Sequence, residues 1–314
     1  MEQYIFGVDL GGTTVKHGLF TVEGRLIDKW EIPTRAENAG GHLLPDIAAS
    51  LKGAMERHNI AAEQLKGIGL GVPGAVSKGR YVAPCVNLNG WGGDVAGDLS
   101  AMMGCPVKAV NDANSAALGE MWQGGAKGHE NVVFVTLGTG VGGGVIVDGR
   151  LVSGAHGAGG EIGHIKVSDS ETEPCGCGKR GCLEQYASAT GILREAKRRL
   201  AADDDISTKL RTFEPLTVKD IFDCAKGGDE MALSIVDFFA ENLGKALAGI
   251  SCVCDPEVFV IGGGISAAGQ IILDKVEAVY RAHAFPASEG TEFVLASLGN
   301  DAGICGCARL MLDV

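Results

Sequence analysis

The sequence predicts an α/β protein built from two similar units, and three observations lead to this prediction. Apolar, β-rich runs end in glycine turns, stretches with helical spacing lie between them, and one strand–turn–strand pattern occurs twice. The first copy reads YIFGVDL, GGTT, VKHGLFTV and EGRLIDKWEIPT, and the second reads NVVFVTL, GTGVGGG, VIV and DGRLVSG. The shared order and spacing indicate a duplicated supersecondary unit, with a chance match of two glycine-rich hairpins as the alternative.

Helices are predicted between the strands, where apolar residues recur at three- and four-residue spacing. These segments are residues 42–58, 114–122, 230–254 and 269–283, with a last helix from about residue 301. We expect a small α/β domain formed by residues 1–113 together with the C-terminal helix, residues 301–314. Residues 114–300 then form a large α/β domain.

The composition limits the classes of partner. The 314 residues carry a net charge of -12, and the 46% that are hydrophobic can fill the core of two domains. A strongly acidic surface argues against nucleic acid and anionic membranes as partners. The start, MEQYIFGVDLGG, lacks the basic and apolar segments of a signal peptide, and no run of about 20 apolar residues occurs. Three of the ten cysteines have metal-ligand spacing and the others lie in apolar runs, so we expect a cytoplasmic protein.

The glycine-rich turns are the predicted phosphate-binding elements. The turn after Asp9 is neither a Walker A loop nor a Rossmann fingerprint, because a strand follows it. Backbone N–H groups and threonine hydroxyls in such turns can still bind an anion, and Asp9 is placed to hold Mg²⁺. Ordinary tight hairpins with a solvated Lys16 are the alternative. The predicted nucleotide-binding residues are Asp9, Gly11, Gly12, Thr13, Thr14, Lys16, Gly138, Thr139, Gly140, Gly262, Gly263 and Gly264.

A carboxylate suited to general-base catalysis stands in PVKAVND, where a strand ends at Asn111 and Asp112 and a helix follows. Moving a phosphoryl group to a hydroxyl requires a base near that hydroxyl. Asp112 is therefore either that base or the N-cap of the helix, and the residues alone leave both readings open.

A metal site is predicted in GEIGHIKVSDSETEPCGCGKRGCLE. Its four candidate ligands are His164, Cys175, Cys177 and Cys182. One imidazole and three thiolates complete a tetrahedral Zn²⁺ site without a position for water, so we expect a structural zinc site. Glu161 and Glu184 lie beside these ligands, and the metal would fix the direction of both carboxylates.

The motifs DLGGTTVK, LGVPGAV, NDANSAALGE, LGTGVGGG, GAGGEIGH, CGCGKRGCLE and VIGGGIS together resemble the signatures of the ROK family of sugar kinases. The resemblance implies the actin-like ATPase (hexokinase/Hsp70, ribonuclease H-like) fold, with two duplicated domains and a cleft between them. It also implies ATP-dependent phosphorylation of D-glucose to glucose 6-phosphate, with ATP, catalytic Mg²⁺, structural Zn²⁺ and a homodimer. One departure is Thr14, where many members have lysine.

The resemblance also assigns roles to single residues. It implies that Asp112 is the general base and that the large domain carries the adenosine site. The residues implied to bind the sugar are Asn87, Asn111, Asp112, Glu161, His164 and Glu184.

Other functions on the same scaffold remain alternatives. A kinase for N-acetylmannosamine, N-acetylglucosamine or fructose would differ at the sugar's 2-position, which the sequence does not resolve. A non-catalytic sugar sensor would need neither Asp112 nor the phosphate turns. The first phosphate strand begins by Tyr4, so we expect no helix-turn-helix domain of the kind that family repressors carry.

Overall fold

The computed structural model describes residues 2–85, 88–202 and 207–313. Packing divides the chain into two compact units. Unit one comprises Met1–Gly128, Gly144–Gly160 and Ser297–Val314, and unit two comprises His129–Gly143 and Glu161–Ala296. Unit one extends past residue 113 because helix α4, which begins at Asp112, packs on the C-terminal helix α10. The domain boundaries at residues 113 and 300 stay a prediction. Within the part of the chain that the structure describes, no helix combines the length and apolar character needed to cross a bilayer.

The two large sheets have equivalent strand orders, β3-β2-β1-β4-β8 and β11-β10-β9-β12-β13, and the division between the units falls within β10. In each sheet a hairpin series is continued by two parallel strands, which confirms the predicted duplication. A third sheet has the order β5-β6-β7. The strands are β1 Tyr4–Leu10, β2 Thr14–Thr21, β3 Leu26–Pro33, β4 Leu65–Val72, β5 Val76–Ser77, β6 Tyr81–Cys85, β7 Trp91–Gly93, β8 Val107–Asn111, β9 Val132–Leu137, β10 Val141–Val147, β11 Arg150–Leu151, β12 Val258–Gly262 and β13 Glu292–Leu295.

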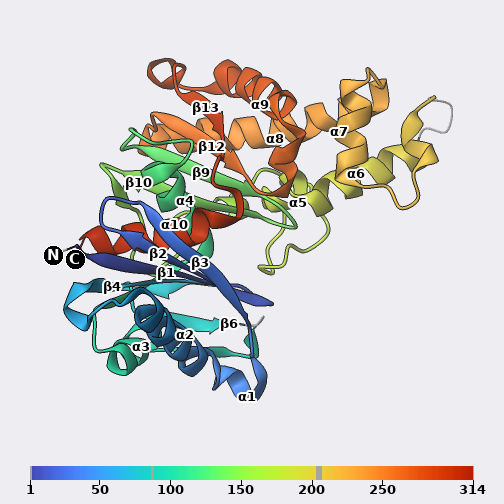
Figure 1. The fold of residues 1–314 in the computed structure, drawn as a ribbon. Helices are drawn as coiled ribbons and strands as arrows, with labels where there is room; N and C mark the ends of the chain where they lie inside the picture. Colours follow the sequence, from blue (N-terminus) through green and yellow to red (C-terminus); the bar gives the residue numbers. More distant parts are fainter. Residues whose placement is uncertain (1, 86–87, 203–206, 314) are drawn as a thin grey trace. The chain divides into compact units, whose positions relative to one another are not determined.

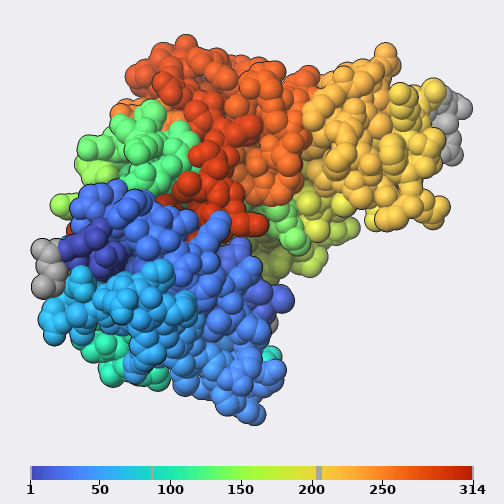
Figure 2. Space-filling view, in the orientation of Figure 1, coloured from blue at the N-terminus to red at the C-terminus, as the bar shows by residue number. Residues whose placement is uncertain are grey.

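Helices cover the sheets, as Figure 1 shows within each unit. In Figure 2, α6 and α7 form a lobe at one side of unit two. The helices are α1 Glu37–Gly40, α2 Leu43–His58, α3 Val95–Met103, α4 Asp112–Gln123, α5 Glu184–Ala187, α6 Ala189–Ala202, α7 Val218–Lys226, α8 Glu230–Cys254, α9 Gln270–His283 and α10 Ala302–Leu310. Short 3₁₀ turns are η1 Ala62–Gln64, η3 Ile162–His164, η4 Lys209–Thr212, η5 Gly264–Ala268, η6 Pro286–Ser288, η7 Gly299–Asp301 and η8 Met311–Asp313.

The five predicted helices are present, and α8 has the predicted bounds. The second repeat differs in detail, because β10 begins at Val141 and includes glycines that the sequence placed in a turn. Its last strand, β11, has only two residues. The small sheet β5-β6-β7 and helices α3, α5, α6 and α7 were not predicted.

Helix α10 packs unusually close to the first sheet and to α4. A Cβ atom built on Gly7 of β1 would lie 1.9 Å from the Ile304 carbonyl oxygen, and one on Gly69 of β4 would lie 1.8 Å from the Cys307 oxygen. On the opposite side of α10, a Cβ on Gly306 would lie 1.6 Å from the Ser115 oxygen. Only glycine permits such backbone contact. These glycines therefore fix α4 and β1 on the two sides of one helix.

A buried carboxylate holds the chain where it enters α10. Glu120 of α4 is fully buried. Its side chain accepts hydrogen bonds from the N–H groups of Gly125 at 2.8 Å, Ser297 at 3.0 Å and Leu298 at 2.9 Å. These hydrogen bonds satisfy the buried side chain, so Glu120 ties the α10 segment to α4.

We predict that Gly306→Ala lowers the free energy of unfolding by at least about 3 kcal/mol, because the added methyl group overlaps the Ser115 carbonyl. Gly249→Ala on α8 is the matched control: a Cβ there meets no atom within 4 Å. Replacing a helical glycine by alanine should stabilise the control by about 0.5–1 kcal/mol. Urea unfolding measures both. Equal stabilities of the two variants would contradict the close packing of α10.

Candidate active site

The first predicted phosphate turn joins β1 to β2 and includes Gly11, Gly12 and Thr13, with Thr14 as the first residue of β2. Asp9 is the second-last residue of β1 and pairs directly with Lys16 in the antiparallel register. Cross-strand partners share a face of the sheet, so the charge of Lys16 acts on the Asp9 carboxylate. Lys16 also lines a cavity of about 330 Å³ with Lys29, Asn300 and Asp301, among others.

The Asp9 carboxyl has a pKa raised to about 6, against an ordinary value of 3.8. Burial is the main cause and the nearby Asp112 carboxylate adds to it, whereas Lys16 acts in the opposite direction. On the α10 side, a Cβ on Gly303 would lie 2.6 Å from Asp9 Oδ2. The Asp9 carboxylate therefore packs against the first turn of α10, and a bound cation would stabilise its ionised form.

Asn111 and Asp112 follow each other at the junction of β8 and α4. The N-cap is Asn111: its Oδ1 accepts from the N–H groups of Ala113 at 2.9 Å and Asn114 at 3.2 Å, and its Nδ2 donates to the Gly74 oxygen at 3.1 Å. The capping role that the sequence left open for Asp112 thus falls on its neighbour. Asp112 keeps an exposed edge, although neighbouring protein surrounds most of its carboxylate, and this carboxylate accepts the Ala113 N–H at 2.8 Å.

The pKa of Asp112 is also raised, with burial as the largest cause and hydrogen bonds from the Ala113 N–H among the opposing ones. Asp9 and Asp112 come from strands β1 and β8, which flank β4 in the same sheet. Both strands end at the same edge because they run parallel to β4. Unit one therefore presents two carboxylates with raised pKa values at one edge of its sheet.

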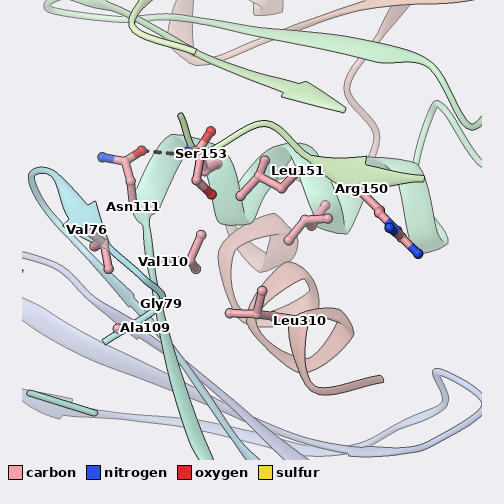
Figure 3. Close-up of a pocket in the computed structure, with 11 residues that line it drawn as sticks. Val76, Gly79, Ala109, Val110, Asn111, Arg150, Leu151, Ser153 and Leu310 are labelled. Carbon is pink, nitrogen blue, oxygen red and sulfur yellow. Dashed lines mark hydrogen bonds between the residues drawn. The ribbon is translucent and has the colours of Figure 1, made fainter. Parts of the chain in front are cut away.

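A cavity of about 190 Å³ lies beside Asn111 within unit one (Figure 3). Figure 3 shows Asn111 at one end of this cavity and Arg150 at the other, with Val110 and Leu310 between them. Most of the remaining lining is apolar, and Asn111 is the only predicted site residue in it. The predicted site residue Asn87 lies outside the described residues, so its position is not part of the structure.

The predicted zinc ligands are brought together. The donor atoms of His164, Cys175, Cys177 and Cys182 all lie within 4.8 Å of one another. Cys177 Sγ and Cys182 Sγ are 3.7 Å apart, and Cys175 Sγ is 3.8 Å from His164 Nδ1. Zinc–sulfur bonds of about 2.3 Å in a tetrahedron place sulfurs about 3.8 Å apart. The donor set and spacing therefore fit a closed, structural Zn²⁺ site.

The zinc loop is also held by protein contacts. Arg194 of α6 donates to Glu171 at 2.6 Å, to Glu173 at 3.1 Å and to the Gln185 carbonyl at 3.0 Å. Gln185 Oε1 in turn accepts from the N–H groups of Gly181 and Cys182. Metal and ion pairs thus act together on one loop.

Glu184 links the zinc cluster to the second phosphate turn. Its Oε1 lies 3.5 Å from Cys175 Sγ, and its Oε2 accepts from the Val141 N–H at 3.2 Å. A Cβ on Gly140 would lie 2.2 Å from Glu184 Oε2, so a larger residue there would displace the carboxylate. Gly138, Thr139 and Gly140 form the turn between β9 and β10. Two predicted site elements of unit two are therefore in direct contact.

Glu161 precedes the 3₁₀ turn η3 and His164 is its last residue, and both are exposed. This turn packs on β10, because a Cβ on Gly163 would lie 2.0 Å from the Val141 oxygen. Since His164 Nδ1 faces Cys175, the ring presents Nε2 away from the cysteine. Glu161 and His164 are therefore accessible to a ligand, whereas Glu184 is partly buried.

A larger cavity of about 460 Å³ adjoins the second phosphate turn in unit two. One of the three glycines predicted at the end of strand β12, Gly264, lines the cavity. Gly262 is the last residue of β12, and Gly263 makes the turn that follows, with a φ of 82°. Sequence reasoning missed most of this lining, although the amphipathic pattern of α7 was available as a signal. The lining residues are Gly138, Thr139, Ala189, Val218, Lys219, Phe222, Asp223, Gly264, Ile265, Ala267 and Ala268.

Zinc content and loop order test the metal centre. We predict that Cys182→Ser loses the bound zinc and that amide hydrogen exchange rises across residues 164–184, because one of four ligands is removed. Elemental analysis and exchange mass spectrometry measure both. Cys252→Ser, outside the cluster, is the matched control and should retain metal. A wild-type protein that binds no zinc would contradict the assignment.

The raised pKa of Asp9 predicts that the free energy of unfolding depends on pH. The folded chain binds this proton more tightly than the unfolded chain, so the stabilisation is complete below pH 3.8 and lost as the pH rises through about 6. In magnesium-free buffer, Asp9→Asn should therefore be more stable than wild type at pH 7.5, by up to about 3 kcal/mol, with the difference shrinking towards pH 4. Thermal unfolding across pH tests this, with Asp98→Asn on α3 as control. A less stable Asp9→Asn at pH 7.5 would contradict it.

Comparison with known proteins agrees with this geometry. The ROK family model matches residues 5–314. A glucokinase of Halalkalibacterium halodurans is 42% identical over 310 residues, covering 97% of this chain and 94% of the relative.

Solved structures agree as well. A ROK family glucokinase from Streptomyces griseus, in complex with glucose and AMPPNP, has a TM-score of 0.75 and 33% identity, covering 99% of this chain and 100% of that one. The ROK hexokinase from Thermus thermophilus has a TM-score of 0.82 and 31% identity, covering 98% and 97%. These likenesses confirm the predicted actin-like ATPase fold. With a family match over nearly its whole length, this chain belongs to the ROK family.

Proposed function

We propose that this protein is an ATP-dependent glucokinase that converts D-glucose and ATP to glucose 6-phosphate and ADP. The observation that carries the proposal is Asp112, a carboxylate with a raised pKa at the end of β8 whose capping role is taken by Asn111. A base with a pKa nearer neutrality removes a proton more effectively at physiological pH. The glucokinases of H. halodurans and S. griseus support glucose as the acceptor.

In the proposed reaction, Asp112 accepts the proton of the glucose 6-hydroxyl as O6 attacks the γ-phosphorus of ATP. The bond from O6 to phosphorus forms, the bond from phosphorus to the β–γ bridging oxygen breaks, and ADP leaves. Asn111, Glu161, His164 and Glu184 are proposed to bind sugar hydroxyls. Zinc supports the last three through the loop geometry and takes no part in the transfer.

The nucleotide is proposed to use the glycine turns of both units and the cavity of unit two. Gly11, Gly12, Thr13 and Thr14, with Gly138, Thr139 and Gly140, supply N–H groups and hydroxyls to the phosphates, and Lys16 supplies a positive charge. Phe222 and Ile265 give the 460 Å³ cavity an apolar wall suited to an adenine ring. Gly262, Gly263 and Gly264 remain proposed contacts at its edge.

Asp9 is proposed to hold Mg²⁺, whose charge neutralises that of the phosphates during transfer. Its position beside the first turn and its raised pKa support this role. We further propose a cytoplasmic homodimer without nucleic-acid or membrane partners, which accords with the net charge of -12.

Coupled ADP release across a panel of hexoses tests the function. We predict turnover with glucose and none with N-acetylglucosamine or N-acetylmannosamine. Preference for an acetylated amino sugar or fructose would assign another substrate to the same chemistry. No turnover with any sugar would favour a sugar sensor and contradict the proposal.

Asp112→Asn tests the proposed base in the same assay. Loss of the carboxylate should lower kcat by about 10²–10⁴, because the amide cannot take the proton. The affinity for glucose, measured by calorimetry, should stay within a few-fold of wild type. Asp94→Asn, which affects an N-cap ion pair on α3, is the control and should keep its kcat. A nearly active Asp112→Asn would remove the base assignment.

A further inference from the structure

Each phosphate turn has two main-chain N–H groups without a partner among the residues that the structure describes. They belong to Gly12 and Thr13 in the first turn and to Thr139 and Gly140 in the second. Phosphate oxygens accept hydrogen bonds from such groups. What each turn can bind therefore depends on how firmly its peptide planes are oriented.

The carbonyl groups of both turns are held by residues outside them. In the first turn, Thr34 donates its hydroxyl to the Gly11 oxygen at 2.8 Å and its N–H to the Thr13 oxygen at 2.9 Å. In the second, the Ala189 N–H donates to the Gly138 oxygen at 2.8 Å, and the Thr190 hydroxyl donates to the Thr139 oxygen at 3.1 Å. Each turn is thus held by one threonine hydroxyl.

These contacts decide where the free N–H groups point. In a planar trans peptide, the carbonyl of one residue and the N–H of the next point in opposite directions. Holding the Gly11 oxygen therefore orients the Gly12 N–H, and holding the Thr139 oxygen orients the Gly140 N–H. The threonine hydroxyls act from the side of each turn opposite to its donors.

The Thr190 hydroxyl is itself fixed in direction. Its Oγ lies 2.8 Å from the Oγ of Ser188, and its proton goes to the Thr139 oxygen, so Ser188 must be the donor between the two hydroxyls. Ser188 is fully buried and accepts the Gly191 N–H at 3.1 Å at the start of α6. In this short chain of hydrogen bonds, each hydroxyl proton therefore has a single acceptor: Ser188 donates to Thr190, and Thr190 donates to the Thr139 oxygen.

The same segment connects the turn to the zinc loop. Glu184 follows the ligand Cys182 by two residues and holds the Val141 N–H on the other side of the turn. Residues 184–190 therefore grip the second turn at Thr139 and at Val141.

We propose that Thr34 and Thr190 are positioning residues that orient the phosphate-binding N–H groups of the two turns. In this proposal they act through the backbone of Gly11 and Thr139 rather than by contact with the phosphates. The inference rests on the proposed function, because it assumes that the turns bind the phosphates of ATP.

Steady-state kinetics of Thr190→Val and Thr34→Val test the inference. Each should raise the KM for ATP about three- to tenfold, as expected for losing one hydrogen bond, with the KM for glucose within twofold of wild type. Thr190→Ser and Thr34→Ser keep the hydroxyl and should restore the KM for ATP. Thr212→Val is the control, because Thr212 donates to the Lys209 oxygen at 2.7 Å within η4 and should change neither KM.

Calorimetric titration with the ATP analogue AMPPNP separates the two proposals. If wild-type protein phosphorylates no hexose, the proposed function is wrong, and weaker AMPPNP binding by the valine variants still supports the positioning role. If wild type is active and both folded valine variants keep wild-type KM and AMPPNP affinity, the inference is overturned. Equal increases in the two KM values, without rescue by serine, would also overturn it.

Discussion

The structure of unit one depends on backbone contact between α10 and its neighbours. Glycines at positions 7, 69 and 306 let this helix approach β1, β4 and α4 within distances that any side chain would prevent. Asp9 lies in β1, and Asp112 is the first residue of α4. Close packing without side chains leaves little freedom to slide, so the spacing of the two carboxylates is set by the fold rather than by their own interactions. Burial in this packing is the largest cause of both raised pKa values, and the Asp112 carboxylate adds to the rise at Asp9.

In unit two, several contacts hold the exposed zinc loop in one conformation. Four zinc ligands, the ion pairs of Arg194 and the two-sided contact of Glu184 act on the segment 160–190 together. Because this segment also holds the carbonyls of the second phosphate turn, order in the loop and order in the turn are linked. A sugar kinase profits from such linkage, since acceptor and donor must be oriented at the same time.

Local patterns in the sequence predicted what depends on local chemistry. The apolar spacing of residues 230–254 gave the bounds of α8, and the ligand spacing of Cys175, Cys177 and Cys182 gave the metal site. Two contacts were not predictable from local patterns. The cap at the start of α4 falls on Asn111 rather than on the adjacent Asp112, and the buried Glu120 side chain accepts the N–H of the distant Ser297. Thr34 and Thr190 carry no motif, because their role comes from which carbonyl the fold places beside them.

The most direct test of the account is a crystal structure with glucose and AMPPNP bound. We predict that glucose O6 lies within about 3 Å of the Asp112 carboxylate, with the phosphates on the glycine turns and zinc on the four-ligand cluster. A sugar whose O6 faces a different residue, far from Asp112, would contradict the central claim.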